Sequence, residues 1–245
     1  MLSPDLALAL LLNRTAMSYT QNRPAYIVYD EYTHVSAPSL GRSQDINRHV
    51  AVRELDNFAV MHDLPNGGER TGNAFPIIPY FDPWSQFSFR WQANLKNVVI
   101  DLQRTRPYTI AIPQDTPGVD VLIPYFSIWA PRYAPDSTEN APHFAIDPVP
   151  GLTGLYVSDV QVDAASSLPS HMELRTLNDD EVIGLDFKAL SGHWTIVRGT
   201  FTSTEHVAIA TFKVIAEIRY ENISFPADAP DPRLATPASP EPTKL

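Results

Sequence analysis

Between residues 195 and 226 the chain alternates apolar and polar side chains through two long segments with no helix-length break between them. Successive side chains of a β-strand point to opposite faces of a sheet, so a period of two is what a half-buried antiparallel strand requires. This feature predicts a β-rich protein with one dry and one solvated face. No catalytic motif accompanies it, so it constrains architecture rather than chemistry.

The same period recurs in shorter segments elsewhere in the chain. Strands are expected at residues 26–36, 46–52, 58–62, 155–162, 171–177 and 181–190. Turn-forming residues, for example Ser191 and Gly192, separate the later segments at the distance typical of hairpins. The pattern therefore predicts a long meander of antiparallel strands.

A helix is expected at the amino terminus, from about Pro4 to about Tyr19. Ser3 offers a hydroxyl cap, Pro4 suits the first helical position, and Asp5 lies near the positive end of the helix dipole. Apolar residues cover much of its circumference, which predicts deep packing against the sheet. The expected fold class is mainly β, a curved antiparallel sheet or incomplete β-barrel with an N-terminal helix packed on or in it.

The length of 245 residues allows one large β domain, which we place at residues 1–225. Residues 226–245 contain six prolines and little that can be buried, so a disordered tail is expected there. Residues 132–151 have loop chemistry almost throughout and exceed the usual length of a connection. This segment or the N-terminal helix is therefore a candidate lid.

Composition excludes several classes of function. A net charge of -10 disfavours binding to nucleic acid phosphates. The absence of cysteine removes disulfides, thiolate metal sites and cysteine nucleophiles. The longest apolar run, from Leu6 to Leu12, is too short for a bilayer, which takes about 20 residues of helix. An integral membrane protein is not expected.

The best constellation for metal binding or hydrolysis consists of Asp136, Glu139, His143 and Asp147. Their spacing matches no specific motif, and the chain has no nucleophile elbow, phosphate-binding glycine loop or dinucleotide fingerprint. We therefore expect no catalytic residue, no metal site and no cofactor, and we do not expect an enzyme. A hydrolase or metal-dependent enzyme that uses the 132–151 segment remains an alternative.

The order of one helix, many long strands and a proline-rich end resembles the lipoprotein-localisation carriers of bacterial envelopes (LolA- and LolB-like domains). Residues 155–187, with the turn from Asp163 to Pro169, are similar to the late hairpins of that family. The resemblance implies an incomplete antiparallel barrel whose concave apolar face receives acyl chains. It also implies a periplasmic or secreted protein that binds a lipid or other apolar molecule, with an envelope protein as a further partner.

Aromatic residues on the predicted strands are candidates for the lining of such a cavity. The candidates are Phe87, Phe89, Trp91, Trp129, Trp194, Phe201 and Phe212. A curved sheet can enclose a ligand cavity, or it can fill its interior with side chains. The expected function is non-enzymatic binding of an apolar ligand, and a ligand-free β interaction module is the other alternative.

Overall fold

The computed structural model describes residues 2–65, 67–74, 79–80, 89–92, 97–100, 110–111, 128–148, 156–207 and 210–235. The strands are β1 Tyr26–Ala37, β2 Arg42–Arg53, β3 Phe58–Asp63, β4 Glu69–Asn73, β5 Phe89–Gln92, β6 Asn97–Ile100, β7 Ile110–Ala111, β8 Ile128–Tyr133, β9 His143–Asp147, β10 Tyr156–Val162, β11 Pro169–Arg175, β12 Glu181–Leu190, β13 His193–Val207 and β14 Ala210–Ser224. The helices are α1 Pro4–Gln21, α2 Pro232–Ala235 and the 3-10 turn η1 Pro38–Leu40.

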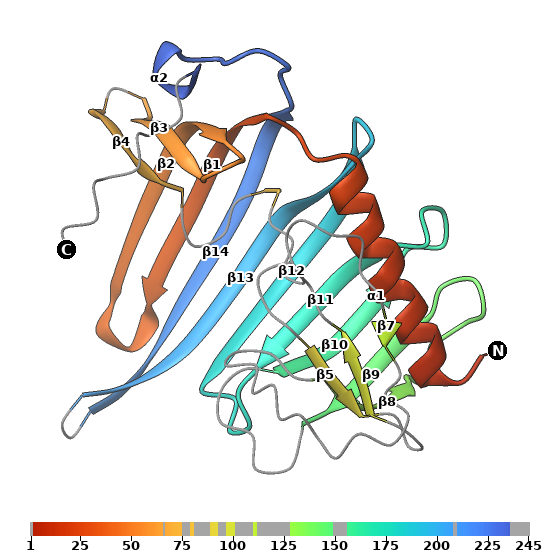
Figure 1. The fold of residues 1–245 in the computed structure, drawn as a ribbon. Coiled ribbons are helices and arrows are strands. Elements are labelled where there is room, and N and C mark those ends of the chain that lie inside the picture. Colours follow the sequence, from red (N-terminus) through yellow and green to blue (C-terminus); the bar gives the residue numbers. More distant parts are fainter. Residues whose placement is uncertain are drawn as a thin grey trace, which may run out of the picture.

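All the described strands belong to one open sheet, and α1 crosses one of its faces (Figure 1). The strand order is β4-β3-β2-β1-β14-β13-β12-β11-β10-β9-β8-β5-β6-β7. Pairing is antiparallel except between β5 and β8. The sequence-based expectation of a mainly β protein with an antiparallel sheet is confirmed, and the sheet is not closed into a barrel.

Four strand pairs contain register shifts, which add local twist and bend the sheet. They lie between β1 and β14, between β8 and β9, between β10 and β11, and between β12 and β13. In the first case the shift falls between Val28 and Asp30, and in the last it falls between Asp186 and Phe187.

We call the face of the sheet that carries α1 the helix face. Leu8 and Leu11 of α1 are buried in one core cluster with Val160, Leu185 and Trp194 of the sheet. Complete burial of a leucine contributes roughly 1.5–3 kcal/mol, so these two side chains stabilise the packing of the helix on the sheet. Within the described residues, neither helix is both long and apolar enough to span a membrane.

The segment after β14 folds back beside β3. Leu234 of α2 is fully buried against Ala51 and Val60, and its carbonyl oxygen accepts a 2.7 Å hydrogen bond from Arg53. The expectation of disorder from residue 226 onward is therefore wrong for residues 226–235. Residues 236–245 lie outside the described part of the chain.

The 132–151 segment also differs from the expected loop. Arg132 and Tyr133 end β8, and His143–Asp147 forms β9, which pairs with both β8 and β10. Phe144 is 1% exposed and Ile146 is 4% exposed, so β9 contributes to the core. Parts of the segment, at residues 132–133 and 143–147, therefore belong to the sheet, and residues 134–142 connect them.

Candidate functional site

A row of apolar side chains extends the core across four strands on the helix face. Phe201 of β13 lies opposite Ile183 of β12 and also opposite Ala216 of β14. Ala216 in turn lies opposite Val35 of β1. All four residues are half-buried, and Ile183 packs against the core cluster. We call these four residues the apolar row.

The next row toward the core contains a buried glycine. Gly199 lies between Leu185 and Ile218, and a Cβ atom added there would meet them at 3.8 Å and 3.9 Å. These are ordinary van der Waals distances, so the glycine is packed between its neighbours without any close backbone approach.

A hollow of about 590 Å³ lies at the other side of the row, where the β1–β2 hairpin and β14 end. Val35, Ala37, Gln44 and Val214 contribute to its lining. Phe212 lies one pair farther along β14, opposite Glu205, and is half-buried. Apolar surface therefore continues from the core toward the free end of the β13–β14 hairpin.

The predicted cavity residues have different positions in the structure. Trp194 is 4% exposed, stacks on Phe187 at 4.2 Å, and donates a 2.8 Å hydrogen bond from Nε1 to the carbonyl oxygen of Pro169. It is part of the packed core. Phe201 and Phe212 lie on the helix face with partial exposure.

The remaining candidates belong to the middle of the chain. Phe89 and Trp91 lie in β5, and Trp129 lies in β8, where Gln92 pairs with Trp129. The structure describes only the backbone of these three residues, and Phe87 lies outside the described residues. The apolar row itself includes Ile183, Ala216 and Val35, which were not predicted as site residues, although their alternation on long strands was a usable signal.

A polar group borders the row on β1 and β2. Arg48 lies 3.9 Å from Glu31 and 3.6 Å from Asp63, measured between side-chain nitrogen and oxygen atoms. Tyr29 packs edge to face against Tyr220 at 5.3 Å. Burial, and then the charge of Glu31, raise the pKa of the Tyr29 hydroxyl, so it stays protonated. The helix face thus changes from apolar to polar along β1.

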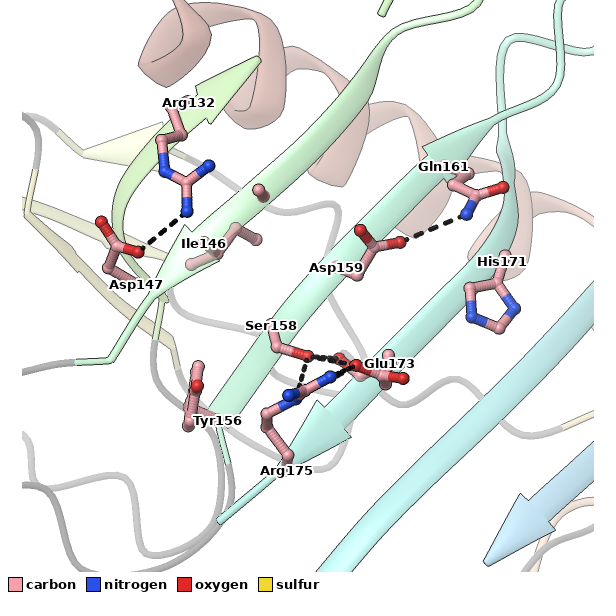
Figure 2. A pocket seen from close by; sticks show the side chains of 11 residues that line it. Arg132, Ile146, Asp147, Tyr156, Ser158, Asp159, Gln161, His171, Glu173 and Arg175 are labelled. Carbon is pink, nitrogen blue, oxygen red and sulfur yellow. Dashed lines mark hydrogen bonds and ion pairs between the residues drawn. The ribbon is translucent and has the colours of Figure 1, made fainter. Parts of the chain in front are cut away.

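The opposite face, which we call the outer face, holds a polar hollow of about 420 Å³ over β8 to β11 (Figure 2). Arg132 pairs with Asp147 at 3.3 Å, and Arg175 bonds both Glu173 and the hydroxyl of Ser158. Because these charged groups already neutralise one another, the hollow offers no unpaired charge of either sign among them.

The expected metal or hydrolase constellation is divided by the structure. His143 bonds Asp136 on one side and Asp159 on the other, each at 2.6 Å, whereas Asp147 pairs with Arg132. Across the residues that the structure describes, no group of three or more acidic, histidine or cysteine side chains is placed to hold a metal ion.

The chain matches no protein-family model, and no curated protein matches its sequence. Three solved structures are similar to it at low sequence identity and low TM-score. A LolA superfamily protein from Nitrosomonas europaea is 8% identical, with 97% of this chain and 99% of that chain covered and a TM-score of 0.40. A domain from Vibrio parahaemolyticus described as outer-membrane lipoprotein-sorting is 9% identical, with 87% and 93% covered and a TM-score of 0.39.

A DUF1329 family protein from Desulfovibrio piger is also similar, at 12% identity and a TM-score of 0.40, with 91% of this chain and 94% of that chain covered. At these values the likeness concerns the arrangement of the strands.

Proposed function

We propose that this chain is a non-enzymatic protein of the bacterial envelope that binds a lipid or another apolar molecule on the helix face of its sheet. The observation that carries the proposal is the apolar row of Ile183, Phe201, Ala216 and Val35. These side chains are half-buried, yet they continue a face whose neighbouring residues form the closed core. The periplasmic or secreted location follows from the sequence resemblance.

Sequestration is the mechanism, and the hydrophobic effect supplies the driving force. Apolar surface removed from water contributes about 25 cal/mol per Å², so part of an acyl chain laid along the row is enough for useful affinity. The row lies beside the core that holds α1. A ligand that extends from the row toward the core would displace α1, which makes this helix the movable cover in the proposal.

The alternative of a hydrolase or metal-dependent enzyme would use Asp136 and His143, which bond each other, without Asp147, which pairs with Arg132. The other alternative is a ligand-free β interaction module, for which we expect no bound apolar molecule. The deciding experiment is native mass spectrometry of the purified chain, followed by organic extraction and identification of any released molecule. A mass increment that extracts as lipid supports the proposal.

Two lysine variants on neighbouring residues of β13 make the test specific. Phe201 points to the helix face and Thr202 to the outer face, and both are half-buried. We expect Phe201→Lys to lose the extracted lipid and the uptake of offered fatty acid, because it places a charge in the apolar row. Thr202→Lys should retain both. Equal binding by both variants, or a bare polypeptide mass in the unaltered chain, would favour the interaction module.

A further inference from the structure

His143 occupies a position unlike that of the other histidines with resolved partners. Its Nδ1 lies 2.6 Å from Asp136 Oδ1, and its Nε2 lies 2.6 Å from Asp159 Oδ2. By contrast, His171 bonds one carboxylate, that of Asp186, through one ring nitrogen. The side chains of His143 and Asp159 are 18% and 23% exposed, so their contact is largely shielded from water, whereas Asp136 is 75% exposed.

With both aspartates ionised, only one protonation state of His143 satisfies both contacts. An ionised carboxylate only accepts hydrogen bonds, and a neutral imidazole donates from one nitrogen alone. Both 2.6 Å contacts are satisfied together when His143 carries a proton on each nitrogen and is positively charged. Loss of that proton leaves a lone pair facing a carboxylate, which breaks one contact and adds repulsion between the two aspartates.

The two aspartates belong to different parts of the fold. Asp136 lies in the connection between β8 and β9, whereas Asp159 lies in β10, the next strand of the sheet. The ladder between β9 and β10 is short, with paired residues only from His143 to Ala145. The bond between His143 and Asp159 therefore adds a side-chain contact between the hairpin and β10, beside the backbone bond from the Val162 N–H to the carbonyl oxygen of Pro142.

This hairpin also supports α1. The hydroxyl of Tyr133 donates a 3.0 Å hydrogen bond to the carbonyl oxygen of Leu2, just before the helix. Phe144 and Pro142 line a groove of about 230 Å³ together with Leu10 and other residues of α1. Movement of the hairpin would therefore change its contacts with the amino-terminal part of α1.

Arg132 and His171, on strands near His143, have partners of their own. On β8, Arg132 pairs with Asp147 of β9. On β11, His171 pairs with Asp186. Glu139, in the same connection as Asp136, lies on the α1 side of the loop, where it lines the groove. The two aspartates thus remain the groups that respond directly to the charge of His143.

We propose that His143, held between Asp136 and Asp159, is a pH-sensitive clasp that fastens the β8–β9 hairpin to β10 and opens as the imidazole loses its proton. This proposal does not depend on ligand binding. Burial by itself lowers the pKa of His143, but the hydrogen bonds and charges of Asp159 and Asp136 outweigh it, so the pKa lies above its ordinary value. Because the pKa of His143 is raised in the folded state, the clasp is complete below about pH 6.5. It is lost as pH rises through the folded-state pKa.

The test is amide hydrogen exchange of β9 across pH 6 to pH 9, with the NMR titration of the His143 ring in the same samples. Protection factors, corrected for intrinsic exchange, should fall in β9 by about tenfold for each unit by which the His143 pKa is raised, while those of β12 stay level. His143→Gln should abolish this pH dependence. An ordinary or lowered His143 pKa, or β9 protection that does not change with pH, overturns the proposal.

Two further variants keep the test sound. His171→Gln removes a histidine on the same outer face that has a single carboxylate partner, and it should retain the unaltered pH dependence in β9. Asp136→Asn changes a side chain that is 75% exposed, so the fold should tolerate it, and it should lower the pKa of His143. A His143 pKa that stays the same in Asp136→Asn counts against the clasp.

Discussion

At the scale of single residues, two aromatic side chains of β13 have different roles. Trp194 is closed into the core by Phe187 and by its hydrogen bond to Pro169, whereas Phe201 is half-exposed in the apolar row. We expect Trp194→Ala to lower the free energy of unfolding by about 3–5 kcal/mol, as large-to-small changes of core aromatics do. Urea denaturation measures this, and a loss below about 1 kcal/mol would show that Trp194 is not a core residue.

The side-chain partners of residues in β1 were harder to predict than the face of the strand on which each residue lies. Alternation over residues 26–36 puts Tyr29, Thr33 and Val35 on one face of the strand, and Asp30 and His34 on the other. It does not show their partners: the structure pairs His34 with Asp45 and Asp30 with His49, across to β2. The register between β1 and β2 decides these pairs, and it is set by the turn at η1, where Gly41 adopts a left-handed conformation with φ of 59°.

At the scale of elements, the short helix α2 has a measurable role. Leu234 packs against Ala51 and Val60, and its carbonyl oxygen accepts a hydrogen bond from Arg53. The guanidinium of Arg53 also forms an ion pair with Asp56. Removing residues 232–245 should lower the free energy of unfolding by about 2–3 kcal/mol, the cost of exposing a buried leucine. The matched control removes only residues 236–245 and should leave stability unchanged. Equal stability of the two truncations contradicts the proposed role of α2.

Long elements were easier to predict from the sequence than short ones. The residues of β12 were predicted with the bounds that the structure has, because ten residues of alternation make a strong signal. In β9 only Phe144 and Ile146 alternate inward, between prolines and polar residues, so five residues of strand read as loop. In α2 a single leucine among prolines carries the burial, which no periodicity reveals.

At the scale of the whole molecule, the order of strands depends on pairings between distant parts of the chain. β1 pairs with β14, so the apolar row combines residue 35 with residues 183, 201 and 216. Local alternation predicts that each of these residues faces one side of a strand, but it contains no information on which strands are neighbours. The candidate site could therefore be predicted as a type of surface and not as a set of residues.

The stability of the whole molecule should depend on pH with a maximum near neutrality. Arg53 lowers the pKa of Asp56 through a hydrogen bond, and Asn222 and His49 lower that of Asp30 against the opposing effect of burial. Carboxyl groups with lowered pKa values stabilise the fold above about pH 4, and this contribution is lost as pH falls through their folded-state values.

On the alkaline side two different groups act in separate ranges. The raised pKa of His143 makes its contribution complete below about pH 6.5 and lost as pH rises through the folded-state value. Burial raises the pKa values of Tyr29 and Tyr220. Their contribution to the stability of the fold therefore decreases only above about pH 10, where tyrosines of the unfolded chain ionise. Urea denaturation between pH 3 and pH 9 therefore isolates His143, and His143→Gln should flatten the decline above pH 6.5 while leaving the acid side as it was. A decline of the same size in His143→Gln would assign the alkaline loss to another group.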